Sequence, residues 1–87
     1  MFMNERENKK YLKAIGNNIK ALRNELKLSY RSLAQKCDVD HSQISKIEKG
    51  YVSFEILTLL ELAKGLEVHP KKLLEIDWRE KHNEYYV

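Results

Sequence analysis

Apolar residues recur at helical spacing along the first third of the chain. They lie three or four residues apart, which places them on one side of an α-helix. The positions are Leu12, Ile15, Ile19, Leu22 and Leu26. The pattern predicts an amphipathic helix of about five turns over residues 9–27. Residues 1–8 lack the pattern and are expected to form a flexible segment.

A second, shorter helix is indicated by the residues that follow. Ser29 can cap a helix whose inward-facing residues would be Leu33, Ala34 and Cys37. Asp38 then lies where the chain must leave this helix. Asp adopts the left-handed backbone conformation more readily than most residues, so it suits this position.

A third helix is expected over residues 40–49, because Asp40 can cap its start and Gly50 can end it. Ile44 and Ile47 give it a narrow inward-facing stripe. The opposite face is polar or basic and carries His41, Ser42, Ser45, Lys46 and Lys49. The joint to the preceding helix is too short for anything but a sharp angle. That arrangement is typical of a helix-turn-helix, whose second helix lies in the major groove of DNA.

Two further helices complete the expected fold. The fourth covers roughly residues 54–64, is rich in Leu, and is ended by Gly65. The fifth has Pro70 in its first turn. Its apolar residues are Leu73, Leu74 and Ile76. The sequence therefore predicts a compact all-α domain of five helices over residues 9–76, followed by a charged and aromatic tail at 77–87.

Charge is distributed unevenly along the 87 residues, which are enough for one domain. Residues 1–50 hold eleven Lys and Arg against six Asp and Glu, a balance of +5. Residues 51–87 hold five against seven, a balance of −2. A basic half suggests an anionic partner such as nucleic acid, although a solvated surface would look the same by charge alone.

Other classes of function lack a signal in the sequence. The single Cys allows no intramolecular disulfide, and with three scattered His it matches no metal-ligand spacing. There is no nucleophile–base pair and no Gly-rich phosphate loop, which predicts a protein that is not an enzyme. No cofactor or small-molecule ligand is indicated. Without a signal peptide or a membrane-spanning stretch, a cytoplasmic location away from membranes is expected.

The run "LKLSYRSLAQKCDVDHSQISKIEKG", followed by "LLELAKGLEVHPKKLLEI", resembles the Cro/CI-type (XRE-family) helix-turn-helix of lambdoid phage repressors. The resemblance covers residues 12–76 and implies a compact five-helix, lambda-repressor-like domain that binds double-stranded DNA. Family positions imply base contacts by His41, Ser42 and Lys46. They imply contacts to the DNA backbone by Tyr30, Arg23 and Lys49. Ser45, on the same polar face of the third helix, is also expected to contact the backbone. The family positions also pair Arg23 with Glu48, which would tie the first helix to the third.

Three departures from the family pattern affect these expectations. Tyr30 replaces the usual Gln, so any contact of its hydroxyl with phosphate must differ in geometry. Asp38 replaces a common Gly, which would cost about 1 kcal/mol of backbone strain. "YVSF" follows Gly50, where relatives often place Lys or Arg, and this predicts a weaker hold on phosphate there.

Some of these residues also have structural interpretations. His41 could be an exposed helix residue without a role, although its family position favours a base contact. Asp40 is expected to act as a helix cap, although a carboxylate in the groove could also accept from cytosine. Cys37 is expected to be a small core residue rather than a redox sensor.

The function expected from the resemblance is a small sequence-specific transcriptional repressor. It would act as a homodimer on an inverted-repeat operator, because one domain contacts too few base pairs for specificity. The expected dimer surface is formed by late apolar residues, namely Leu57, Leu60, Leu74, Trp78 and Tyr85. Two other DNA-binding functions remain open, namely a restriction–modification controller and an antitoxin. A protein–protein adaptor module with the same fold is an alternative of another class.

Overall fold

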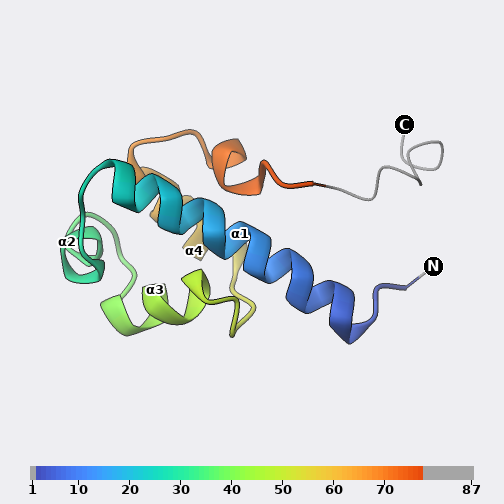
Figure 1. The fold of residues 1–87 in the computed structure, drawn as a ribbon. Helices are drawn as coiled ribbons and strands as arrows, with labels where there is room; N and C mark the ends of the chain where they lie inside the picture. The colour runs from blue at the N-terminus through green and yellow to red at the C-terminus, as the bar shows by residue number, and fades with distance from the viewer. Residues whose placement is uncertain (1, 78–87) are drawn as a thin grey trace.

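The computed structural model of the chain describes residues 2–77. It contains four α-helices and one 3₁₀ helix over these residues (Figure 1). Their bounds are α1 (Glu5–Glu25), α2 (Tyr30–Ala34), α3 (His41–Glu48), α4 (Ile56–Leu66) and the 3₁₀ helix η1 (Pro70–Leu74). The predicted all-α class is confirmed. The predicted fifth helix is present as the 3₁₀ helix η1, which ends at Leu74 and does not include Ile76.

Helix α1 is the axis on which the other elements pack. Figure 1 shows α3 on one side of α1, η1 on the other and α4 behind it. The buried apolar side chains come from every helix and meet in one core. They include Ile19, Leu33, Ile44, Ile47, Leu62, Leu66 and Leu73. Because α1 is packed from several sides, it holds α3 in a fixed position. Over residues 2–77, no helix is both long and apolar enough to cross a lipid bilayer.

Helix α1 begins at Glu5, so the sequence-based start at Lys9 was wrong. Asn4 accepts a hydrogen bond from the Glu7 backbone N–H at 2.9 Å, and Glu7 accepts one from the Asn4 N–H at 3.3 Å. This reciprocal capping box makes the first two turns helical without any apolar periodicity. Residues 5–8, which were expected to be flexible, therefore belong to α1.

Two predicted helix caps are confirmed, and the conformation predicted for Asp38 is wrong. Ser29 accepts from the Ser32 N–H at 3.0 Å, and Asp40 accepts from the Ser42 N–H at 2.8 Å. Asp38 is not among the residues with positive φ, so the expected backbone strain is absent there. Its N–H instead donates to a carboxylate oxygen of Glu61, on α4, at 2.9 Å. The turn is therefore stabilised by a side chain from another helix.

Gly65 was predicted to end α4, but it lies inside this helix. The helix continues to Leu66 and ends at Glu67, whose φ is 60°. A Cβ atom on Gly65 would lie 2.9 Å from Leu33 Cδ1 and 3.2 Å from Cys37 Cβ. The glycine thus permits the close approach of α4 to the α2 region. Burial raises the pKa of the Cys37 thiol, which supports its interpretation as a core residue.

Gly16 permits a close approach of α1 to α3 in the same way, and a side chain at this position would be tolerated less well. A Cβ atom there would lie 2.5 Å from the carbonyl oxygens of both Ile47 and Glu48. Ala is favoured over Gly in a helix by about 1 kcal/mol, but a clash with backbone atoms forces the helices apart. We therefore expect Gly16→Ala to lower the free energy of unfolding by a net ~1–2 kcal/mol in urea denaturation.

Gly65→Ala is the matched control for this prediction. The nearest atom in its way is the end of the Leu33 side chain, which can move more easily than a backbone carbonyl. Its effect should therefore be the smaller of the two. Equal or reversed effects would show that the α1–α3 contact has more freedom to adjust than the distances indicate.

Candidate nucleic-acid interface

Helix α3 turns its apolar side to the core and its polar side outward, as predicted. Ile44 and Ile47 are fully buried against α1 and α2. With both isoleucines directed inward, the residues between them must face solvent. The short α2 and the turn after it set α3 at an angle that leaves this outer side uncovered within residues 2–77 (Figure 1).

All the residues predicted to contact DNA, except Arg23, line one groove on this outer side. The groove has a volume of about 470 Å³. Its lining residues are Tyr30, His41, Ser42, Ser45, Lys46, Lys49 and Tyr51. Side chains from the start of α2, the whole of α3 and the segment after it therefore meet in one concave surface. We call this surface the α3 groove.

The carboxylate that caps α3, that of Asp40, contacts two residues that line the α3 groove. The Ser42 hydroxyl donates to Asp40 Oδ1 at 3.0 Å, and His41 Nδ1 lies 3.8 Å from the same oxygen. Hydrogen bonds from the Ser42 backbone and hydroxyl lower the pKa of Asp40, because they stabilise its ionised carboxylate. This geometry supports Asp40 as a cap that also orients its two neighbours.

Arg23 and Glu48 meet in a buried, two-pronged ion pair between α1 and α3. Arg23 Nε donates to Glu48 Oε2 at 2.6 Å, and Nη2 donates to Oε1 at 2.9 Å. Nη1 donates to the Leu28 carbonyl at 2.6 Å. The hydrogen bonding that Arg23 donates to the Glu48 carboxylate raises the pKa of Arg23 above its already high ordinary value. With 8% of its surface exposed, Arg23 lies beneath the surface and does not line the α3 groove.

Tyr30 covers this ion pair and still reaches the α3 groove. The Arg23 guanidinium lies 4.4 Å from the centre of the Tyr30 ring, within the range of a cation–π contact. The side chain lines the groove as well. The substitution of Tyr for the usual Gln therefore adds an aromatic cover for Arg23 and presents a hydroxyl on the surface.

Tyr51 is a groove residue that the sequence analysis missed. Gly50 adopts a φ of 73° and turns the chain after α3, which leaves Tyr51 74% exposed. The Lys49 ammonium lies 5.9 Å from the centre of its ring. The missed signal was the position itself, directly after a helix-ending glycine. An aromatic residue there was interpreted as the loss of a cation, although its hydroxyl can donate to phosphate.

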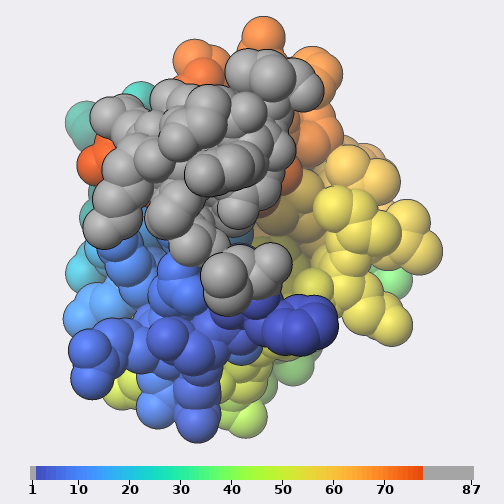
Figure 2. Space-filling model, turned by 90° about the vertical axis from the view of Figure 1, so that its right-hand side faces the viewer, coloured from blue at the N-terminus to red at the C-terminus, as the bar shows by residue number. Residues whose placement is uncertain are grey.

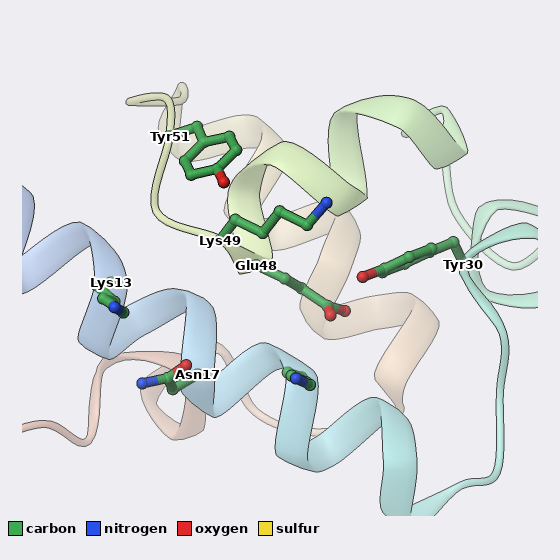
Figure 3. Close-up of a pocket in the computed structure, with 7 residues that line it drawn as sticks. Lys13, Asn17, Tyr30, Glu48, Lys49 and Tyr51 are labelled. Carbon is green, nitrogen blue, oxygen red and sulfur yellow. The ribbon is translucent and has the colours of Figure 1, made fainter.

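A second, smaller pocket lies next to the α3 groove, against α1, and has a volume of about 280 Å³ (Figure 3). It shares three residues with the groove, namely Tyr30, Lys49 and Tyr51. It adds Lys13, Asn17 and Lys20 of α1 and the edge of Glu48. We call it the α1 pocket. The three α1 residues were not predicted from the sequence, although their spacing places them on one side of the helix.

Apolar residues predicted to form a dimer surface are exposed where the structure describes them. Leu57, Leu60 and Leu74 are all partly or largely accessible, and Ile56, which was not predicted, is exposed beside Leu57. Trp78 and Tyr85 lie outside the described residues. On the face of the molecule that Figure 2 shows, the segment that leads into α4 (yellow) lies at the right, and most of α1 (blue) lies at the lower left.

Comparisons with known proteins agree with this arrangement. The helix-turn-helix family HTH_3 matches residues 19–73. The restriction-modification controller protein C.AhdI from Aeromonas hydrophila is 29% identical with a TM-score of 0.69, over 71% of this chain and 94% of that one. An HTH_3 family transcriptional regulator from Vibrio cholerae is 32% identical with a TM-score of 0.72, over 76% of this chain and 37% of that one. No curated protein sequence matches.

Proposed function

Because this chain belongs to the helix-turn-helix family HTH_3, we propose that it is a transcriptional regulator that binds a specific sequence of double-stranded DNA and represses transcription. The observation that carries the proposal is the α3 groove. It gathers neutral hydrogen-bonding groups and two lysines around a helix anchored by Ile44 and Ile47. The protein would act by binding alone, in the cytoplasm, without catalysis, a metal or a cofactor.

The proposed mechanism follows from the positions of the groups along α3. His41 and Ser42 lie in its first turn, which enters the major groove in this class of motif. Neutral His41 offers one donor and one acceptor to a purine edge, and Lys46, one turn later, donates to guanine or to phosphate. Ser45, Lys49 and Tyr30 also line the α3 groove, and we propose that they contact the DNA backbone.

Selection of bound sequences from random duplex DNA is the direct test of this proposal. The enriched motif should be an inverted repeat whose half-sites lie about one helical turn apart or a multiple of it. His41→Ala should relax base preference at one position in each half-site. It should cost about 1–3 kcal/mol on the preferred sequence and little on nonspecific DNA.

Ser42→Ala is the control within the same turn. Its hydroxyl is already bonded to Asp40, so its removal should change base preference less than the loss of His41. Recovery of no enriched motif at moderate salt would instead support the adaptor function. A motif unchanged by His41→Ala would remove His41 from base recognition.

A controller of restriction–modification genes is the second candidate function. The similarity to C.AhdI extends over 94% of that protein, whereas it covers 37% of the Vibrio cholerae regulator. The similarity to a controller protein therefore extends over nearly the whole of that chain, which supports this candidate function. The selected motif, placed before a reporter gene, shows whether the bound protein represses or activates transcription, and activation would contradict simple repression.

A homodimer is the proposed form of the protein on DNA. The exposed residues Leu57, Leu60 and Leu74 support it, because apolar side chains of this size favour burial against a second copy. A dimer would also place two α3 helices on one face, as an inverted-repeat operator requires.

A further inference from the structure

We infer that the α1 pocket binds a backbone phosphate of DNA, so that helix α1 takes part in binding together with the helix-turn-helix. The inference rests on the proposed function and extends it, because the DNA-contacting residues expected from the family do not include Lys13, Asn17 or Lys20. The phosphate would lie outside the base pairs read by His41 and Lys46. It would therefore add affinity without adding sequence preference.

The pocket is built from three segments that the fold brings together. Lys13, Asn17 and Lys20 follow one another at intervals of four and three residues, so they share one side of α1. The close contact at Gly16 sets the C-terminal end of α3 directly against this side. In Figure 3 the hydroxyl of Tyr30 points toward Glu48, between α1 and α3, and the Tyr51 ring lies beside Lys49 at the end of α3.

The groups that line the pocket are mostly donors without a carboxylate partner. Within residues 2–77, the ammonium groups of Lys13, Lys20 and Lys49 form no ion pair. Asn17 adds an amide, and the two tyrosines add hydroxyls. Three cations and several neutral donors in a pocket of about 280 Å³ suit the charge and the hydrogen-bonding needs of a phosphate group.

The one acidic residue in the lining does not oppose an anion. Glu48 is 3% exposed, and both of its carboxylate oxygens accept hydrogen bonds from Arg23. Its charge is therefore balanced within the protein. Glu48 contributes to the wall of the pocket, and the net charge that faces solvent there comes from the lysines.

Continuity with the α3 groove indicates which phosphate source the pocket serves. Tyr30, Lys49 and Tyr51 line both cavities, so a DNA strand that crosses the groove passes the mouth of the α1 pocket. A free phosphate ion would gain nothing from this continuity. A polymer of evenly spaced phosphates would contact both cavities at once.

The test measures how duplex affinity depends on salt when the α1 lysines are lost. We expect Lys13→Gln/Lys20→Gln to make the slope of log affinity against log salt shallower by about 0.9, the value for one phosphate. Affinity should fall about tenfold near 0.1 M salt, equally on preferred and unrelated duplexes. Both lysines are exposed, and a thermal melt of the variant checks that the fold is retained.

Lys71→Gln is the matched control, because it removes one exposed cation from η1, across α1 from α3 (Figure 1). For this variant, the slope of log affinity against log salt should equal that of the unmodified protein. A second arm replaces single backbone phosphates by neutral methylphosphonates outside the recognised bases. One such replacement should weaken binding by the unmodified protein and cause no further loss in the double variant.

Each remaining outcome has a distinct meaning. If the unmodified protein binds no duplex, the proposed function and this inference fail together. If it binds duplex with a steep salt slope that the double variant keeps, this inference alone is overturned. Inorganic phosphate is also added at constant ionic strength. If it shifts the NMR resonances of the Tyr51 ring in the unmodified protein but not in the double variant, and both proteins have the same salt slope on duplex DNA, the pocket binds a free anion. The inference is then again overturned.

Discussion

Replacing Glu48 with Ala should lower the free energy of unfolding by about 3–5 kcal/mol. The substitution leaves the Arg23 guanidinium buried with neither of its two carboxylate contacts. Its remaining protein hydrogen bond goes to the Leu28 carbonyl, and the Tyr30 ring still covers it. Neither partner carries a full negative charge, so the cost of burying the cation is no longer offset. Urea denaturation measures the loss.

Glu25→Ala is the control for this prediction, because Glu25 is exposed at the end of the same α1 helix that carries Arg23. It should change stability by less than about 0.5 kcal/mol. A double variant, Arg23→Met/Glu48→Leu, removes both charges and keeps apolar volume. It should recover much of the loss, because the penalty comes from the unpaired cation. A Glu48→Ala effect as small as that of Glu25→Ala would contradict the buried pair.

Apolar periodicity and helix caps predicted the parts of the fold that local sequence determines. The stripe that includes Ile19 was visible because burial requires the spacing of the helix itself. Ser29 and Asp40 were identifiable because a short polar side chain before a helix can satisfy its free N–H groups. The start of α1 was not predicted in this way, because the capping box at Asn4 is polar and precedes the first residue of the apolar stripe, Leu12.

The structural role of each glycine could not be predicted from one sequence. A glycine near the end of a helical pattern serves equally as a C-cap or as a point of close contact between helices. Gly50 ends α3 with a positive φ, as predicted, whereas Gly65 lies within α4 and makes room for Leu33. The choice depends on which helix packs there, and that is determined by tertiary structure.

The α3 groove was predictable almost entirely, and the α1 pocket was not. Most of the groove residues fall on one side of α3, so spacing alone groups them, whereas Tyr30 comes from α2 and Tyr51 from the segment after α3. Lys13 and Lys20 acquire their setting because Gly16 brings α3 against α1. Tyr51 joins them because Gly50 turns the chain back toward α1. Such a site depends on long-range packing and leaves no local pattern in the sequence.

Leu57→Gln/Leu60→Gln should dissociate the proposed homodimer and lower affinity for a two-half-site operator by about 10²–10⁴-fold. Joining two half-site contacts in one assembly raises affinity by that factor without any new contact, and separating them loses it. Both residues are exposed on α4, so the substitution should not unfold the domain. Equilibrium sedimentation should show a dimer for the unmodified protein and a monomer for the variant.

Leu26→Gln provides the matched control for the dimer prediction. Leu26 is 42% exposed and Leu60 is 43% exposed, but Leu26 follows α1 and is not part of the proposed surface. Its loss should leave both sedimentation and operator affinity unchanged. On a duplex with a single half-site, the α4 variant and the unmodified protein should bind nearly equally, since each α3 groove is intact. A monomeric variant that keeps full affinity for the complete operator would place the dimer contact elsewhere in the chain.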